Sequence, residues 1–454
     1  MKNIILDVDS YKSSHWKQYP EGTTKVFSYV ESRGGKYSQT LFFGLQYILS
    51  KLEETVTNEM VDEARDFFKD HGVPFNEEGW RYIANELKGK LPLRIKAVPE
   101  GFVVPTSNVL MTIENTDPKC YWLTSWMETS LLRVWYPITV ATQSFNIKKI
   151  IKGFLNETSD DPNSEILFKL HDFGSRGVSS QESASIGGAA HLVNFLGSDT
   201  VAGVYLANKH YNAKMSGFSI PASEHSSITS WGRENEVEAY RNMLKQFGKP
   251  GALVACVSDS YDLYNAVENL WGKTLKNEVI NSGAMLVVRP DSGDPTETAL
   301  KTVQLLDKTF GSTYNKKGYK VLNHTRVIYG DGINEESIRS ILNALKSNGY
   351  SATNMAFGMG GALLQQVNRD TQRFAMKCSS ATIQGNQVDV YKDPITDHGK
   401  ASKKGRLDLI YLQGKFQTVN GDGNFGSVLK VVYENGKIVK RQTLDEIRKI
   451  ASEF

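Results

Sequence analysis

The sequence is poor in cysteine and lacks a long apolar run. Only three cysteines, Cys120, Cys256 and Cys378, occur in 454 residues, and so few, scattered thiols indicate a reduced, cytosolic protein rather than a disulfide framework. No apolar stretch approaches the ~18 residues of a membrane-spanning helix. The first residues reach a charge too early for a secretory signal peptide. These absences predict a cytoplasmic protein without a membrane segment.

An excess of either charge is also missing. Lys and Arg number 53 and Asp and Glu 50, a net charge of +3, which argues against a dedicated nucleic-acid-binding protein. The sequence has no Walker A motif and no glycine-rich dinucleotide fingerprint after a first strand. Cysteine and histidine do not recur at metal-ligand spacing, so we expect no structural metal held by the protein.

The chain is long enough for two or more domains. A polar, turn-rich stretch at residues 156–164 suggests a boundary, and the pattern changes after it. Short apolar runs recur at 168–174, 200–204, 253–259, 285–289, 326–332 and 355–361, most followed by a helical pattern. This alternation predicts a parallel sheet with right-handed crossovers, and polar residues at several strand ends favour a barrel. Earlier, Asp117-Pro118 predicts the start of one long helix through Trp135.

The stretch Met285–Pro295 illustrates such a strand end. Residues 285–288 are apolar, the pattern of a strand buried on both faces. Asp294 and Pro295 predict the cap and first residue of a helix. Capping explains Asp294 but leaves Arg289 and Asp291 unexplained, although desolvating both at a buried strand end is costly. The stretch therefore predicts a functional site at the junction of strand and helix.

Polar side chains and glycines follow several predicted strands and should meet at one edge of the sheet. They are Asp172, Arg176, Ser258, Asp259, Asp262, Arg289, Asp291, Gly330, Asp331 and Gly332. Asp291 and Asp331 follow consecutive strands at equivalent places. Paired carboxylates suit a sugar, because they accept hydrogen bonds from hydroxyls and stabilise positive charge at an anomeric carbon. General acid–base catalysis is the alternative, and the pattern does not separate the two.

A glycine cluster, Gly358, Gly360 and Gly361, follows the last of these strands. Such glycines let backbone N–H groups approach a phosphate at a helix start, but close packing would also require glycine. The cations that come next are Arg369, Lys377, Lys392, Lys400, Lys403, Lys404 and Arg406. They form either a solvated face or the binding site of a second, more highly charged group.

His225 lies in the stretch Ile220–Ser226, just before a predicted helix. A lone histidine is more often structural than catalytic. Glu224 beside it does not settle the role, because neighbours in sequence need not face each other.

Taken together, these residues resemble the nicotinamide phosphoribosyltransferase family of type II phosphoribosyltransferases. The matching stretches are Asp9-Ser10-Tyr11-Lys12, Phe43–Tyr47, Lys96–Gly101, Asp172-Phe173-Gly174, Ala222–His225, Ser258–Asp262, Arg289–Gly293, Gly330-Asp331-Gly332, Lys392-Asp393-Pro394 and Ser402–Arg406. They are long and span nearly the whole chain, so the resemblance is specific.

The resemblance implies an α/β fold with an irregular α/β barrel plus an α+β domain formed from both chain ends. Residues 1–160 would form the N-terminal part of the α+β domain, 165–372 the barrel with the strand ends of the active site, and 373–454 the C-terminal part. The family pattern also implies a homodimer whose active sites lie at the interface.

The implied reaction joins nicotinamide to phosphoribosyl pyrophosphate and gives nicotinamide mononucleotide and pyrophosphate, a step of NAD salvage. Mg²⁺ would neutralise charge on the departing pyrophosphate. ATP, as co-substrate, would phosphorylate His225 and so drive the reaction forward. The ring nitrogen of nicotinamide is already a nucleophile, so the enzyme has to hold it in line with the anomeric carbon and stabilise an oxocarbenium-like transition state.

The family pattern assigns a role to each candidate residue. Phe173 and Tyr11 of the partner subunit would sandwich the pyridine ring, and Arg176 and Asp199 would hold the carboxamide. Gly330, Asp291 and Asp331 would hold the ribose, and Gly360 and Gly361 its phosphate. The two carboxylates and His225 would be the catalytic residues. The pyrophosphate would be bound by Asp9, Arg33, Arg369, Lys377, Lys392 and Lys400, and further substrate contacts would come from Ser219, Ser258 and Arg289. Asp199 can accept from an amide N–H but would repel the carboxylate of nicotinate, which favours nicotinamide as the substrate.

The sequence departs from the family pattern in three places. Ser175 stands where a tyrosine is expected and Ala362 where a third glycine is expected, and the segment between Arg33 and Thr40 is shorter than in vertebrate members. Ser175 changes the outer lining of the ring pocket and leaves the core roles untouched.

Three other functions compete with this interpretation. A nicotinate-using relative would share most of the motifs. A barrel lyase or aldolase acting on a sugar phosphate would need a Schiff-base lysine at a strand end, and the strand ends have none in an obvious position. A non-catalytic binding or signalling protein on the same fold would have lost site residues, whereas Arg289, Asp291, Asp331 and His225 are all present.

Overall fold

A computed structural model describes residues 3–396, 401–421 and 426–454, which fold into two compact units. Unit 1 contains the chain up to Thr142, residues Lys209–Ala213 and the chain from Asn368 onward. Unit 2 contains Gln143–Asn208 and Lys214–Val367. Both chain ends therefore contribute to one unit, and the middle of the chain forms the other.

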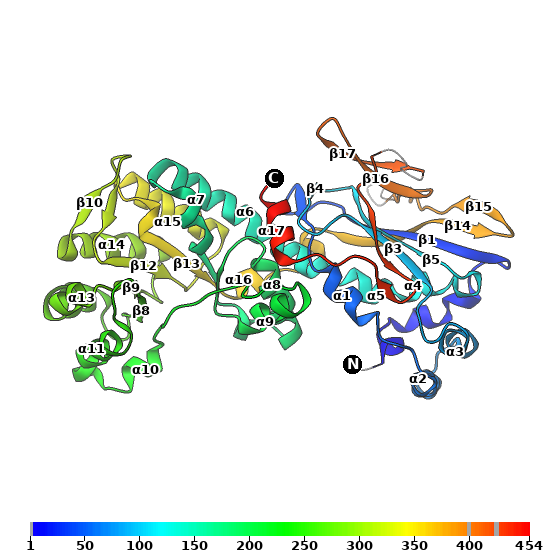
Figure 1. The fold of residues 1–454 in the computed structure, drawn as a ribbon, viewed down its shortest axis with the longest axis horizontal. Coiled ribbons are helices and arrows are strands. Elements are labelled where there is room, and N and C mark those ends of the chain that lie inside the picture. Colours follow the sequence, from blue (N-terminus) through cyan, green and yellow to red (C-terminus); the bar gives the residue numbers. More distant parts are fainter. Residues whose placement is uncertain (1–2, 397–400, 422–425) are drawn as a thin grey trace. The chain divides into compact units, whose positions relative to one another are not determined.

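Unit 1 is built on a seven-stranded antiparallel sheet with the order β15-β14-β1-β5-β3-β18-β19 (Figure 1). Its strands are β1 (Thr23–Ser32), β3 (Leu93–Ala97), β5 (Val109–Asn115), β14 (Phe374–Ile383), β15 (Asn386–Asp389), β18 (Lys430–Glu434) and β19 (Lys437–Ile438). β1 pairs with β5 on one side and with β14 on the other. This pairing confirms the predicted α+β domain formed from both chain ends.

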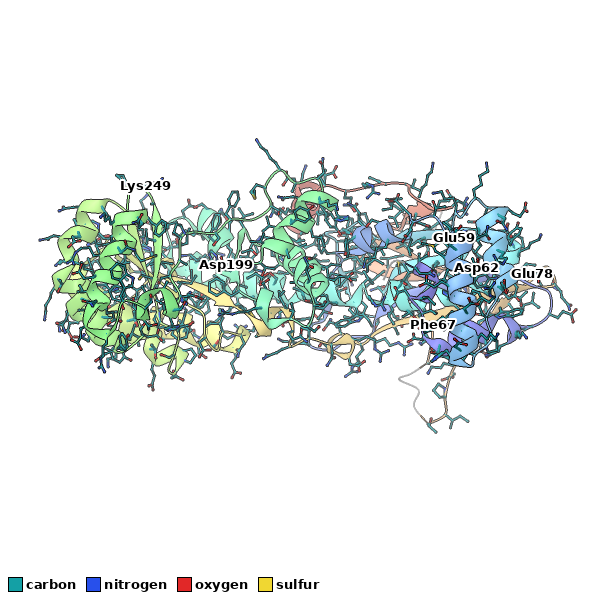
Figure 2. All side chains as sticks on the ribbon, turned by 90° about the horizontal axis from the view of Figure 1, so that it is seen from below. Glu59, Asp62, Phe67, Glu78, Asp199 and Lys249 are labelled. Carbon is teal, nitrogen blue, oxygen red and sulfur yellow. The ribbon has the colours of Figure 1, made fainter. Side chains whose placement is uncertain are left out.

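Short strands and helices surround this sheet. Two further strand pairs are β2 (Gln39–Leu41) with β4 (Val103–Pro105) and β16 (Leu407–Leu412) with β17 (Lys415–Asn420). The α-helices are α1 (Leu45–Lys51), α2 (Asn58–His71), α3 (Glu77–Asn85), α4 (Leu123–Trp126), α5 (Glu128–Leu132) and α17 (Leu444–Ala451), and 3-10 segments cover Ile4–Leu6, Ser10–Lys17, Pro118–Cys120 and Arg369–Thr371. Glu59, Asp62 and Phe67 lie along α2 (Figure 2), and Asp62 accepts a hydrogen bond from Arg81 of α3 at 2.6 Å.

Three tryptophans form the centre of the helical layer of unit 1. Trp80, Trp122 and Trp126 are buried, and their rings meet edge to face with centroids 5.1–5.8 Å apart. These three side chains therefore belong to the core of unit 1.

The predicted single helix from Pro118 to Trp135 is wrong. A 3-10 turn, α4 and α5 occupy this region, and the long helix α6 (Trp135–Thr158) begins only afterwards. The apolar residues of the stretch are buried on several sides, so its pattern does not reveal the breaks. Pro137 lacks an N–H and fits the first turn of α6.

Unit 2 is built on a sheet of six parallel strands in the order β7-β6-β13-β12-β9-β8. They are β6 (Leu170–Asp172), β7 (Gly197–Ser198), β8 (Leu253–Val257), β9 (Met285–Arg289), β12 (Thr325–Tyr329) and β13 (Met355–Met359). The pairs Val257↔Arg289, Tyr329↔Phe357 and Met359↔Asp172 bring the carboxyl ends of neighbouring strands to the same edge. The predicted parallel sheet is therefore confirmed.

An extended segment joins the two edge strands of this sheet. Phe218 bridges to Gly197 of β7, and Ala222 bridges to Ala255 of β8, both in parallel. The backbone N–H of Ser198 donates to Phe218 O at 3.0 Å, and that of Ala255 donates to Pro221 O at 2.9 Å. The sheet curls back on itself through this segment, which confirms the predicted irregular α/β barrel.

Helices cover the outside of the barrel, and Figure 1 shows α11, α13, α14 and α15 beside strands β8, β9 and β12. The helices of unit 2 are α7 (Pro162–Glu165), α8 (Gln181–His191), α9 (Val201–His210), α10 (His225–Thr229), α11 (Glu236–Phe247), α12 (Leu263–Asn265), a π-helix (Ala266–Thr274), α13 (Lys276–Ser282), α14 (Pro295–Phe310), α15 (Glu335–Ser347) and α16 (Gly361–Leu364), with 3-10 turns at Ile166–Phe168, Ser175–Gly177, Arg233–Asn235 and Ala352–Asn354. A short pair, β10 (Ser312–Tyr314) and β11 (Lys320–Leu322), follows α14. Across the residues that the structure describes, no helix has both the length and the apolar character needed to cross a membrane.

The apolar run at 200–204 does not form a strand. Val201 begins α9, and β7 ends at Ser198. Short runs of small and branched apolar residues fit a helix as well as a strand, so periodicity could not decide between them.

Asp294 provides a test of the helix cap that follows β9. Its Oδ1 accepts from the backbone N–H groups of Thr296 at 3.0 Å and Glu297 at 2.9 Å, and so caps α14 as predicted. Asp294→Ala should lower the free energy of unfolding by about 1 kcal/mol, whereas Asp294→Asn should keep most of the cap. Urea unfolding of both variants measures this, and equal losses in the two would contradict it.

Candidate active site

A cavity of about 890 Å³ lies inside the barrel of unit 2. Small residues such as Ala255 and Ala356 form part of its wall, together with Val287 and Ile328. Barrels of this kind usually fill their interior with large branched side chains, so the small side chains leave this space open. Residues after the strand ends, among them Phe173, also line the cavity.

Phe173 follows β6, and Gly358 makes room for its ring. Its backbone N–H donates to Met359 O at 3.0 Å, which extends the pairing of β6 with β13. A methyl group on Gly358 would lie 2.0 Å from the ring, and one on Gly330 would lie 3.4 Å from it. Position 358 therefore has to be glycine for the ring to lie across the end of β13, whereas a methyl group at position 330 would make ordinary van der Waals contact with the ring. At Gly361 a methyl group would meet nothing within 4 Å, so packing does not explain that glycine.

Asp199, labelled in Figure 2, follows β7 and lines the same cavity. Its backbone N–H donates to Asp172 O at 2.9 Å, and its Oδ1 accepts from Ser219 Oγ at 2.5 Å. Ser219 lies on the segment that closes the barrel, so the closure positions this carboxylate. Phe173, Asp199 and Ser219 thus lie together around one cavity, while Arg176 lies exposed on the 3-10 turn Ser175–Gly177.

Asp172 is hydrogen-bonded to both the segment after Phe173 and the segment that carries Asp199. Its Oδ1 accepts from the backbone N–H of Gly174 at 2.7 Å. Its Oδ2 is buried and makes no hydrogen bond with any residue that the structure describes. Burial raises the pKa of Asp172 to about 6, because few donors compensate the desolvated charge.

Asp259, just after β8, joins three parts of the strand edge. Its Oδ1 lies 2.9 Å from His225 Nε2, and its Oδ2 accepts from the backbone N–H of Asp291 at 2.9 Å and from Ser292 Oγ at 2.5 Å. Burial acts to raise the pKa of Asp259, but the bonds from Ser292, His225 and the Asp291 backbone outweigh it and lower the pKa. The charged carboxylate therefore directs the His225 Nε2–H toward itself and fixes the loop after β9.

Asp291 lies beside Gly330, as expected for residues that follow neighbouring parallel strands. A methyl group on Gly330 would lie 3.2 Å from Asp291 Oδ1, and Arg289 Nη2 lies 3.6 Å from Asp291 Oδ2. Tyr329 Oη donates to Ser292 O at 2.7 Å and anchors the same loop from β12. Asp331 is exposed directly after Gly330.

Ser258 is used within the fold. It is fully buried, and its Oγ donates to Cys256 O at 3.0 Å and accepts from Trp271 Nε1 at 3.1 Å. Its contact with a substrate, which the resemblance implies, stays a prediction.

Unit 1 carries a separate group of cations, Lys12, Arg33, Lys377 and Lys392, here called the basic cluster. Burial lowers the pKa of Lys377; Glu128 opposes this shift, and Arg33, Lys392 and Lys12 lower the pKa further. Lys12 is buried and pairs with Glu128 at 2.6 Å. Cations that together lower the pKa of a lysine beside them favour the binding of a polyanion.

The other predicted residues of unit 1 are spread more widely. Asp9 accepts from Thr129 Oγ1 at 2.6 Å, and Tyr11 is 62% exposed on the segment Ser10–Lys17. Arg369 is exposed and pairs with Asp370 at 3.2 Å. Lys400 lies outside the described residues.

Sequence reasoning did not assign a role to Lys12, Glu128 or the carboxylate of Asp259. Lys12 stands inside a quoted motif and Asp259 follows a strand, so both carried a usable signal. No sequence signal pointed to Glu128, because a glutamate in an apolar, tryptophan-rich stretch looks like a solvent-facing residue.

Comparison with solved structures gives the class of the fold. Nicotinate-nucleotide pyrophosphorylase from Pyrococcus furiosus matches with a TM-score of 0.63 and 16% identity, over 99% of this chain and 95% of that chain. Human nicotinic acid phosphoribosyltransferase matches with a TM-score of 0.56 and 14% identity, over 98% of this chain and 92% of that chain. The fold is therefore that of phosphoribosyltransferases with an irregular α/β barrel.

Sequence comparison gives the family. The model of the nicotinate phosphoribosyltransferase (NAPRTase) family matches residues 168–437, and that of the nicotinamide phosphoribosyltransferase N-terminal domain matches residues 3–95. A relative from Xanthomonas campestris pv. campestris (strain 8004), named nicotinamide phosphoribosyltransferase, is 57% identical over 99% of this chain and 98% of its own length. The chain belongs to the nicotinate phosphoribosyltransferase family, and the resemblance seen in its motifs is confirmed.

The buried carboxyl group of Asp172 gives a test of the site's electrostatics. Because its pKa rises from 3.8 to about 6 on folding, its stabilising effect is complete below pH ~4 and is lost as the pH rises through ~6. Asp172→Asn removes this titration, so the stability of the variant relative to wild type should increase by up to about 3 kcal/mol between pH 4 and pH 7. Urea unfolding at several pH values measures the difference, and parallel pH profiles would contradict the assignment.

Proposed function

We propose that this chain transfers the phosphoribosyl group of phosphoribosyl pyrophosphate to nicotinamide, giving nicotinamide mononucleotide and pyrophosphate. The observation that carries the proposal is that a flat aromatic ring, Phe173, and a hydrogen-bond acceptor, Asp199, line the same barrel cavity where they follow the carboxyl ends of β6 and β7. The close similarity to a relative named nicotinamide phosphoribosyltransferase supports it. The pyridine ring would stack on Phe173, and its carboxamide would donate to Asp199 and contact Ser219 and Arg176.

The chemistry requires position and charge rather than a base. The ring nitrogen forms a bond to the anomeric carbon while the bond from that carbon to pyrophosphate breaks, and pyrophosphate leaves with the electron pair. Asp291 and Asp331 would hold the ribose and stabilise the positive charge that develops on it. The first-turn N–H groups at Gly360 and Gly361 would bind the 5′-phosphate, in the open space that a side chain would fill.

Magnesium belongs to the substrate in this proposal. No group of three acidic or histidine side chains in the described ranges is arranged to hold a metal ion. Asp259, the most buried acid of the strand edge loops, already uses both oxygens on His225, Asp291 and Ser292. We therefore assign Mg²⁺ to the diphosphate oxygens, where it would neutralise the leaving group.

ATP would act through His225. Its ring is 45% exposed, so a nucleotide can reach it, and Asp259 fixes its orientation. The γ-phosphoryl group would move from ATP to a ring nitrogen, which forms a P–N bond and releases ADP. Since Asp259 bonds both His225 and the backbone of the Asp291 loop, phosphorylation would act through Asp259 on the loop that carries the ribose-binding carboxylate.

A homodimer in the cytoplasm completes the proposal. Tyr11 offers an exposed aromatic ring, and the basic cluster offers cations for a pyrophosphate. In the family pattern the active sites lie at the dimer interface, and each subunit supplies Tyr11 to the active site of its partner. Asp9, Arg369 and Lys400 would line the same pyrophosphate side.

The decisive assay incubates the full chain with nicotinamide, phosphoribosyl pyrophosphate and Mg²⁺ and follows mononucleotide formation. A parallel reaction with nicotinate separates the two bases, because the fold is shared with nicotinate-using enzymes. Faster transfer to nicotinate would contradict the proposed substrate, and absence of transfer to either base would refute the proposed function.

Asp199→Asn should weaken the discrimination against nicotinate. Asparagine keeps the shape and the bond from Ser219 but removes the charge that repels a carboxylate. We expect the ratio of kcat/KM for nicotinamide over nicotinate to fall by at least about tenfold, roughly the effect of removing one close like-charge contact. An unchanged ratio would show that Asp199 does not select the base.

His225→Ala should abolish the stimulation of transfer by ATP and leave basal transfer within about threefold, because His225 lies outside the proposed path of bond formation. Initial rates with and without ATP measure this, and Ser227→Ala, on the same helix α10, serves as the control. Stimulation that survives in His225→Ala would show that the phosphoryl group is carried elsewhere.

A further inference from the structure

Glu31 is a buried acid within the cationic part of unit 1. It lies on β1 with 3% of its surface exposed. Arg33 Nε donates to its Oε1 at 3.1 Å, and Lys403 Nζ pairs with its Oε2. One carboxylate thus holds two cations that stand far apart in the sequence.

The pair with Lys403 fixes a segment that leads to Lys392. The backbone N–H of Lys403 donates to Tyr29 Oη at 3.0 Å. Next to it, Ser402 Oγ accepts from the backbone N–H of Lys392 at 3.0 Å, and the Ser402 N–H donates to Lys392 O at 3.0 Å. Glu31 is therefore linked through Lys403 and Ser402 to Lys392, a member of the basic cluster.

The pair with Arg33 orients the guanidinium group. With Nε held by Glu31, Nη2 lies buried and makes no hydrogen bond with any residue in the described ranges. A buried donor without a partner is costly, so this group is prepared for an acceptor that arrives from outside. Lys377, on the neighbouring strand β14, feels the charge of Arg33.

A carboxylate among these cations opposes anion binding by its charge alone. Coulomb's law would make the site bind pyrophosphate more tightly without Glu31. Glu31 can therefore increase the affinity for pyrophosphate only by holding the cations in place. A cationic side chain that is already held loses less conformational entropy when it binds the anion.

We propose that Glu31 is a positioning residue for the pyrophosphate group, which fixes Arg33 directly and Lys392 through Lys403 and Ser402. The inference rests on the proposed function, in which the basic cluster binds the pyrophosphate of phosphoribosyl pyrophosphate. Glu31 itself does not touch the substrate.

The test distinguishes two opposite effects on pyrophosphate affinity. Charge alone predicts tighter binding without Glu31, and positioning predicts weaker binding. In Glu31→Gln and Glu31→Ala, the KM for phosphoribosyl pyrophosphate should rise by at least about tenfold, and the KM for nicotinamide should stay within about twofold. The dissociation constant of inorganic pyrophosphate, from calorimetry on the full chain, should rise in parallel. Tighter or unchanged binding of pyrophosphate by Glu31→Gln would overturn the proposal and leave only the electrostatic effect.

Two controls separate positioning from folding. Glu434→Gln removes a carboxylate that pairs with Arg94 at 2.5 Å on the same sheet, and it should leave both KM values unchanged. Lys403→Met should reproduce the part of the effect of Glu31→Gln that passes through Lys403 to Lys392, and the double variant should be no worse than Glu31→Gln alone, because Glu31→Gln already breaks that link. Additive effects in the double variant would refute the link through Lys403. Should Glu31→Ala fail to fold, the isosteric Glu31→Gln gives the answer by itself.

If the wild-type chain forms mononucleotide and the Glu31 variants bind pyrophosphate as it does, only this inference fails. A wild-type chain that binds pyrophosphate without transferring phosphoribosyl defeats only the proposed function. The two failures are therefore distinguishable.

Discussion

The in-register pairing of parallel strands is the constraint on which the rest of unit 2 depends. Because β6, β13, β12, β9 and β8 run in the same direction side by side, the residues that follow them emerge at one edge. Five separate chain segments then need only short loops to bring Phe173, Asp259 and Asp291 together. The closing segment 218–222 adds Ser219 and, just beyond, His225 to the same edge.

Two kinds of structural cost are concentrated at this edge. Gly358 leaves room for the Phe173 ring, and small side chains such as Ala255 and Ala356 leave the cavity open where larger ones would have packed the barrel. Asp172 is buried, and one of its oxygens makes no hydrogen bond within the described ranges, while the side chain of Asp259 is buried with both oxygens bonded. The pKa of Asp172 is therefore raised and that of Asp259 lowered, although both lie at a strand end, which fits a structural role for Asp172 and a charged, connecting role for Asp259.

Much of the fold could be predicted from the sequence, because buried parallel strands are short apolar runs that end in polar residues. This logic located β9, the cap at Asp294 and the two strand ends that are followed by Asp291 and Asp331. It failed for residues 118–135, where apolar residues on all sides conceal the helix breaks, and at Val201, where a strand-like run begins a helix. The links made by Asp259, Glu31 and Glu128 depend on partners distant in sequence, and no local pattern encodes such partners. The roles in substrate binding came from family resemblance rather than from periodicity or spacing.

The central claim is that the strand edge of unit 2 binds the nucleotide product in one orientation. A crystal structure of the chain with nicotinamide mononucleotide tests it most directly. The account predicts the pyridine ring against Phe173, the carboxamide at Asp199, the ribose hydroxyls on Asp291 and Asp331, and the phosphate at the N–H groups of Gly360 and Gly361. Product bound away from these carboxylates, with the cavity beside Phe173 empty, would contradict it.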